Sequence, residues 1–132
     1  MRLHSRRRGQ SLIEIMVVIA IIGILTTVTA VGVMEFLGNA KVDATKIAMS
    51  NVDKVILAYT ARHGHPPTTA EGLQAAATFF PEHLVPTDAW DHALLYQSPG
   101  PDGHDYEVRS LGADGLEGGT GNDADLSSIR GR

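Results

Sequence analysis

The feature that most restricts the fold of this chain is a run of 20 uncharged, mostly apolar residues from Ile15 to Met34. A helix of that length rises about 30 Å, which matches the hydrocarbon thickness of a lipid bilayer. The run contains no proline, and membrane helices tolerate its two glycines, Gly23 and Gly32. Three interpretations fit the run: a transmembrane anchor, a secretory signal cleaved after Ala30, or a membrane helix retained after cleavage on its N-terminal side.

Charge is distributed unevenly on the two sides of this run. Four of the 11 Lys and Arg residues precede residue 10, whereas the remainder of the chain carries seven against 15 Asp and Glu. The basic N-terminus is predicted to stay in the cytoplasm, because Lys and Arg accumulate on that side of membrane helices. The acidic remainder argues against nucleic-acid binding, which needs a basic face. The chain has no cysteine, so disulfides and thiol chemistry are excluded.

Glu14, immediately before the run, helps to distinguish the three interpretations. A carboxylate has no use at the start of a cleaved signal, and it costs about 3 kcal/mol if it is drawn to the bilayer centre. Cleavage after Gly9 would instead create an α-amino cation on Gln10, four residues from Glu14. The carboxylate could pair with this amine or with that of a neighbouring subunit. The sequence therefore favours cleavage after Gly9 and retention of the apolar run.

Helical periodicity continues beyond the apolar run. Apolar residues recur at three- and four-residue spacing as Ala44, Ala48, Val52, Val55, Ile56 and Tyr59. A cationic last turn, Arg62 and His63, is followed by Gly64 and then by two prolines, which is typical of a helix C-terminus. These signals predict one helix from about residue 11 to residue 63.

The C-terminal half predicts a small mixed domain. The capping-box pattern of Thr68 and Glu71 predicts a short helix from Ala70 to Thr78. Residues 93–97 and 106–111 have strand composition and are separated by a turn at residues 98–103. The only tryptophan, Trp90, is expected to anchor the preceding loop in the core.

Residues 111–126 form a loop with four carboxylates and five glycines. Oxygen-rich, flexible loops suit Ca²⁺, which accepts six to eight oxygen ligands in loose geometry. The spacing is not that of an EF-hand, because the glycine and the terminal glutamate of that motif are missing. From the residues alone, a calcium site and an ordinary solvated loop remain equally open.

Three motifs in this order resemble the type IV pilin superfamily, and within it the major pseudopilins of type II secretion. Gly9-Gln10-Ser11-Leu12-Ile13-Glu14 is similar to the class III signal of that superfamily. Pro67-Thr68-Thr69 with Gly72-Leu73, and Ser110-Leu111-Gly112-Ala113-Asp114-Gly115, are similar to two signatures of the major pseudopilin branch. The departures are Gln10, where the family usually has Phe, Val31-Gly32, where many relatives carry a proline, and His65-Pro66, where the family has Tyr-Pro.

The resemblance implies an α+β, pilin-like fold. In that fold a long N-terminal helix, whose first half spans the membrane, packs on a small antiparallel β-sheet with a short helix and a calcium-binding loop. The implied organisation is a cleaved leader (1–9), a transmembrane and assembly segment (10–34), an amphipathic helix (35–63) and a small periplasmic domain (64–132).

The resemblance also implies the roles of individual residues. A membrane peptidase would cleave after Gly9, and the new amine of Gln10 would be methylated. Glu14 would act in subunit assembly. Calcium would be held by the carboxylates of Asp114, Asp123 and Asp125 and by the carbonyl oxygens of Leu111 and Leu116. A soluble form of the C-terminal part is then expected to gain thermal stability on addition of Ca²⁺.

The implied function is that of a non-enzymatic subunit of the type II secretion pseudopilus. Expected partners are further copies of the chain in a helical filament, minor pseudopilins, the inner-membrane assembly platform and the prepilin peptidase. The expected location is the inner membrane, with the N-terminus cytoplasmic and the C-terminal domain periplasmic, and then the periplasmic pseudopilus. A type IV pilus or minor pseudopilin subunit is the alternative, although the lack of cysteine disfavours a typical pilin. No catalytic motif such as Gly-x-Ser-x-Gly or His-Glu-x-x-His occurs.

Overall fold

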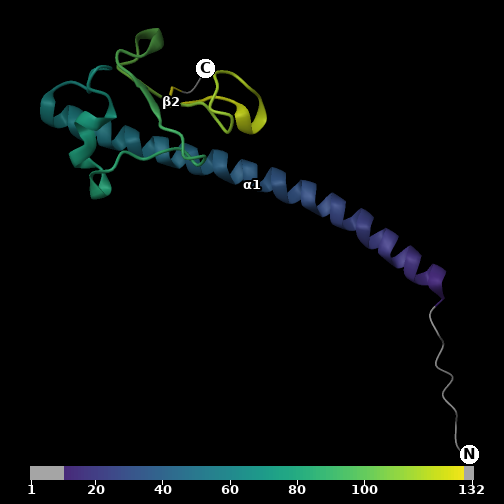
Figure 1. The fold of residues 1–132 in the computed structure, drawn as a ribbon. Helices are drawn as coiled ribbons and strands as arrows, with labels where there is room; N and C mark the ends of the chain where they lie inside the picture. The colour runs from purple at the N-terminus through teal and green to yellow at the C-terminus, as the bar shows by residue number, and fades with distance from the viewer. Residues whose placement is uncertain (1–10, 130–132) are drawn as a thin grey trace, which may run out of the picture. The chain divides into compact units, whose positions relative to one another are not determined.

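The computed structural model describes residues 11–129, except for the side chains of residues 28–31. One long α-helix is followed by four short 3-10 helices and three short strands (Figure 1). In chain order these are α1 (Leu12–His63), η1 (Leu73–Phe79), η2 (Pro81–His83), β1 (Leu95–Gln97), η3 (Pro101–Gly103), β2 (Glu107–Ser110), η4 (Gly121–Asp123) and β3 (Leu126–Ser127). The chain divides into two compact units, Met1–Leu37 and Gly38–Arg132.

In the first unit, α1 is apolar on all sides. Every described side chain from residue 12 to residue 37 is exposed, and the helix includes a stretch with a mean hydropathy of 2.5. Its two described threonine hydroxyls are satisfied within the helix: Thr26 donates to the Ile22 carbonyl (2.7 Å) and Thr27 to the Gly23 carbonyl (2.9 Å). Length and composition therefore allow this part of α1 to cross a membrane without an unpaired hydroxyl at these positions.

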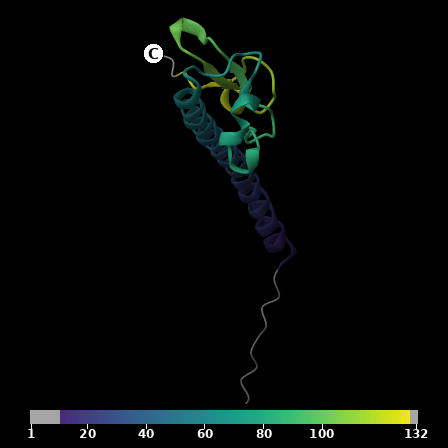
Figure 2. The same cartoon turned by 90° about the vertical axis from the view of Figure 1, so that its left-hand side faces the viewer.

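In the second unit, the rest of α1 supplies one side of the core. The buried stripe runs through Thr45, Met49, Val52, Ile56 and Tyr59. It starts one residue later than the sequence predicted, because Ala44 is exposed and Thr45 takes the inward position. The other side of this core comes from later segments, namely Leu73, Ala76, Phe80, Leu94 and Val108. Figure 2 shows these segments lying along the C-terminal part of the helix.

The predicted end of the helix is confirmed. The Gly64 amide donates to the Thr60 carbonyl (2.7 Å), and Nδ1 of His63 lies 3.0 Å from the Tyr59 carbonyl. The helix therefore ends at His63, three residues before the first of the two prolines, and the carbonyls of Tyr59 and Thr60 are paired in its last turn.

The short helix is displaced from its predicted position. The capping box forms: the Thr68 amide donates to the Glu71 carboxylate (2.8 Å), and the Glu71 amide donates to the Thr68 hydroxyl (3.4 Å). These bonds lower the pKa of Glu71. The box closes only a turn, however, because Gly72 adopts φ 61° and ψ −170°, which is open to glycine but incompatible with a continuing helix. The helix η1 therefore begins at Leu73 and is of the 3-10 type.

The sheet has three antiparallel strands in the order β1-β2-β3. The register pairs Tyr96 with Val108 across β1 and β2, and Arg109 with Ser127 across β2 and β3. The two predicted strands are confirmed in shorter form, whereas β3 was not predicted and begins at Leu126, the last residue of the predicted loop. The α+β fold, with a long helix packed on a small antiparallel sheet, is confirmed.

Candidate functional site

The first turn of α1 carries Glu14, and the side chain is exposed. Ser11 precedes the helix as its N-cap, and its hydroxyl accepts a hydrogen bond from the Glu14 amide (3.3 Å). Glu14 is thus the third helical residue, where a carboxylate also interacts favourably with the helix dipole. Gly9 and Gln10, the predicted cleavage site, lie outside the described residues.

The second candidate site is the acidic loop between β2 and β3. Its two ends are paired, because Ser110 of β2 stands opposite Leu126 of β3. Backbone bonds also tie its interior, from Ala113 to the Asn122 carbonyl (2.9 Å) and from Asp125 to the Gly118 carbonyl (3.2 Å). Gly112 has φ 69°, and a Cβ there would lie 2.7 Å from the Asp123 carbonyl oxygen. The loop is therefore a defined structure in which one glycine permits close backbone contact.

A buried carboxylate, Asp88, links this loop to the segment before β1. Oδ1 accepts the amides of Trp90 (3.0 Å) and His92 (2.8 Å), and Oδ2 accepts the hydroxyl of Ser110 (2.7 Å). The ring nitrogen Nδ1 of His92 lies 3.1 Å from the carbonyl of Gly112. Asp88 is 4% exposed, so these bonds are shielded from water. Trp90 itself is only half-buried and lies outside the core, so its predicted anchoring role belongs to Asp88 instead.

Among the predicted calcium ligands, Asp125 is already engaged on both oxygens. Oδ2 accepts a hydrogen bond from Nη2 of Arg109 at 2.8 Å, and Oδ1 accepts the amide of Gly118 at 3.2 Å. The same Nη2 lies 3.9 Å from Oε1 of Glu117. The hydrogen bond to Asp125 raises the pKa of Arg109, although partial burial acts in the opposite direction.

The other predicted ligands are not gathered around Asp125. Asp114 forms a local turn in which Oδ1 accepts the Leu116 amide (3.0 Å), and the Asp123 side chain is exposed. Within residues 11–129, no three His, Asp or Glu side chains come close enough together to hold a metal ion. Among the described residues, the backbone carbonyls of Leu111 and Leu116 accept no hydrogen bond. The donor chemistry suits calcium, but the predicted set does not fit the ion as it is arranged here, and calcium binding stays a prediction.

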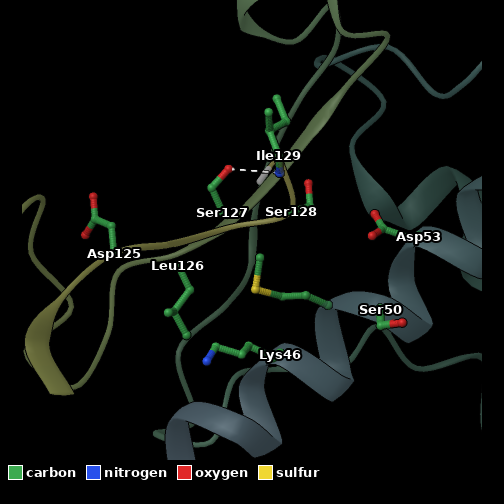
Figure 3. Close-up of a pocket in the computed structure, with 9 residues that line it drawn as sticks. Lys46, Ser50, Asp53, Asp125, Leu126, Ser127, Ser128 and Ile129 are labelled. Atoms are coloured by element: carbon green, nitrogen blue, oxygen red, sulfur yellow. Dashed lines mark hydrogen bonds between the residues drawn. The ribbon is translucent and has the colours of Figure 1, made fainter. Parts of the chain in front are cut away.

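A groove of about 500 Å³ lies next to the loop, between α1 and β3 (Figure 3). Asp53 lies on its helix side, and Oδ1 of Asp53 is buried without a hydrogen-bond partner among the described residues.

Burial raises the pKa of Asp53, while its hydrogen bond with Tyr106 acts in the opposite direction. Burial and the neighbouring Asp53 raise the pKa of Tyr106 to about 12. Because the folded pKa of Asp53 exceeds the unfolded value, its contribution to stability is lost as pH rises through the folded pKa. Folding therefore disfavours the charged form of Asp53 relative to its protonated form.

Sequence reasoning missed two residues of this region, Arg109 and Asp88. Arg109 was part of a predicted strand with no role, although it is the only Lys or Arg between residues 63 and 129. That isolation among carboxylates is the one signal in the sequence that could have identified it. Asp88 gave no comparable signal, because its burial follows from the packing of segments that are distant in the chain.

Comparison with known proteins matches two family models to this chain. The model described as "Type II secretion system (T2SS), protein G" matches residues 32–129. The model described as "Prokaryotic N-terminal methylation motif" matches residues 4–30. Together they include both candidate regions, the first helical turn and the acidic loop.

Relatives of similar length support the same grouping. The chain is 34% identical to the type II secretion system core protein G of Pseudomonas aeruginosa, over 95% of this chain and 96% of that protein. It is 34% identical to the core protein G of Vibrio cholerae, over 97% and 95% of the two chains. Identity to the core protein G of Escherichia coli is 32%, over 89% and 90%.

Proposed function

Because this chain belongs to the type II secretion system protein G family, we propose that its assembly into a helical pseudopilus drives the export of folded periplasmic proteins across the outer membrane. The chain is the structural pseudopilus subunit in this proposal, and no catalytic role is assigned to it. The observation that carries the proposal is the combination of an apolar, exposed helix with a separately packed unit of helix and sheet.

The match to the methylation motif and the apolar helix indicate that the chain is anchored in a membrane. We place its N-terminus in the cytoplasm, because four arginines precede the apolar run, and its acidic C-terminal unit in the periplasm. In this orientation the folded unit stands on the side where exported proteins accumulate before they cross the outer membrane.

Assembly is proposed to begin with cleavage after Gly9. The cut removes the basic segment that holds the N-terminus in the cytoplasm, and it creates the amine of Gln10. Glu14, exposed in the first turn, can pair with this amine on a neighbouring subunit. In lipid the apolar surfaces of helices gain little by association, so such an ion pair has a large influence on register. The apolar helices would then form the centre of the filament, where water is excluded.

Membership of the secretion system implies that the chain assembles with other components of that system. We propose minor pseudopilins, the inner-membrane assembly platform and the prepilin peptidase as those components. Calcium binding by residues 111–126 is a separate proposal, supported by the number of oxygen donors in the loop, and no step of assembly is derived from it.

Deletion of the gene in its own host tests the function. We expect proteins that are normally secreted to accumulate in the periplasm, and the wild-type gene on a plasmid to restore their export. Export by the deletion strain at the wild-type level would contradict the proposed role. The level of the outer-membrane secretin is the control, because its loss would block export for a different reason.

A further inference from the structure

The acidic loop holds a fixed cation of its own. We propose that Arg109 is the resident counter-cation of residues 111–126: its guanidinium binds Asp125 and closes the loop without a metal ion. A calcium ion that used Asp125 as a ligand would have to displace Arg109. The inference concerns the folding of the loop and goes beyond the role of the chain in secretion.

The charge distribution is the first step of the argument. Between His63 and Ile129 the chain has 11 Asp and Glu residues but a single Lys or Arg, which is Arg109. A loop with four carboxylates needs a cation nearby if it is to adopt one conformation, because like charges repel each other at short range. Arg109 is the only permanently positive side chain between His63 and Ile129.

The strand register places that cation at the end of the loop. Arg109 stands opposite Ser127, and Asp125 is two residues before Ser127, in the diagonal position where side chains on the same face can touch. Val108 and Ser110 face the core, so Arg109 points to the outer face of β2. The pairing of β2 with β3 therefore brings Arg109 and Asp125 together, and their contact in turn holds the loop against β2.

The contact extends from Arg109 into the backbone of the loop. Asp125 accepts from Arg109 on Oδ2 and from the Gly118 amide on Oδ1, and its own amide donates to the Gly118 carbonyl. The Asp125 side chain is 23% exposed and that of Arg109 is 32% exposed, so water screens the pair only in part. One carboxylate thus connects the strand, the cation and the middle of the loop.

A second cation beside the groove, Lys46, does not take this role. Lys46 lines the same groove as Asp125, but its ion pair is with Asp43 on α1, at 3.5 Å. Figure 3 shows the carboxylate of Asp125 pointing away from Lys46 and out of the groove. Lys46 is therefore a suitable control, because it is a nearby positive charge that does not contact the loop carboxylate.

Hydrogen exchange of the full-length chain in detergent micelles, with EDTA present, tests this inference. In the wild type the amides of Gly118 and Asp125 should be protected without metal. Arg109→Gln and Asp125→Asn should each speed their exchange by at least about tenfold, as expected when a charge-assisted hydrogen bond is lost. The double variant should exchange no faster than either single variant, because both changes remove the same contact. Lys46→Gln should leave exchange at both amides unchanged.

Addition of Ca²⁺ to the same samples provides the second arm. It should add little protection to the wild type but restore protection in Arg109→Gln, where Asp125 is released. Wild-type amides that exchange rapidly in EDTA and become protected only with Ca²⁺ would overturn the inference, as would an Arg109→Gln variant that behaves like Lys46→Gln. If Ca²⁺ changes exchange in neither the wild type nor Arg109→Gln, the calcium proposal fails. Slow exchange of the wild type and fast exchange of Arg109→Gln in EDTA would still support the role of Arg109 as counter-cation.

Discussion

Replacing Glu14 by glutamine is expected to reduce secretion and pseudopilus formation by at least about tenfold, because the loss of about 1.4 kcal/mol from a subunit contact already weakens that contact about tenfold. The physical reason is the loss of a charge, since glutamine cannot form an ion pair with the amine of Gln10 on a neighbouring subunit. Glutamine also serves at the third position of a capping box, so the start of α1, with Ser11 as N-cap, should be preserved. The measurement is secreted protein per cell, together with the amount of fibre sheared from cells that overproduce the chain.

Glu35→Gln is the matched control for this prediction. Glu35 is another exposed glutamate on α1, but it follows the apolar run and has no part in the proposed ion pair. Its replacement should leave secretion near the wild-type level. The assembly role of Glu14 would be wrong if Glu14→Gln secreted normally, or if both variants failed to the same extent while the chain remained in the membrane.

Replacing Asp88 by alanine is expected to destabilise the second unit by about 3 kcal/mol. The change leaves the amides of Trp90 and His92 and the hydroxyl of Ser110 without their buried acceptor, and hydrogen bonds to a charged group contribute about 1.5–3 kcal/mol each. In a unit of this size the thermal midpoint should fall by more than about 10 °C. The chain has a single tryptophan, Trp90, so its fluorescence reports directly on the segment that Asp88 holds.

Two variants separate the role of this carboxylate from a general effect of charge. Asp88→Asn keeps one oxygen as an acceptor, so it should cost less than Asp88→Ala. Asp91→Asn removes a nearby charge at an exposed position with φ 67°, a conformation that asparagine tolerates, and it should change the midpoint little. A midpoint for Asp88→Ala within about 2 °C of the wild type would contradict the proposed importance of its hydrogen bonds.

The features that the sequence predicted correctly depend on neighbouring residues. The apolar run, the cationic last turn and Gly64 define α1 almost to the residue, because helix formation and capping involve groups within four positions. The capping box of Thr68 and Glu71 is also local, and its hydrogen bonds form as expected. The position of the short helix was predicted wrongly because the capping box does not determine the backbone conformation of Gly72, which interrupts the helix.

The features that were missed depend on contacts between distant residues. Strand β3 is two residues long and has no alternating pattern, so only its pairing with β2 defines it. The contact of Arg109 with Asp125 follows from that pairing and could not be found before it. The calcium site stays a prediction, because composition reveals how many oxygen donors a loop contains but not whether they converge on one point.

The intact mass of the chain recovered from sheared pseudopili tests the central claim most directly. The account predicts that the chain is present in the fibre, begins at Gln10 and carries one methyl group on its amine. Such a mass would show that the basic segment is removed and that the apolar helix enters the filament. A chain that begins at Val31, or one that retains Met1, would contradict the account, as would its absence from the fibres.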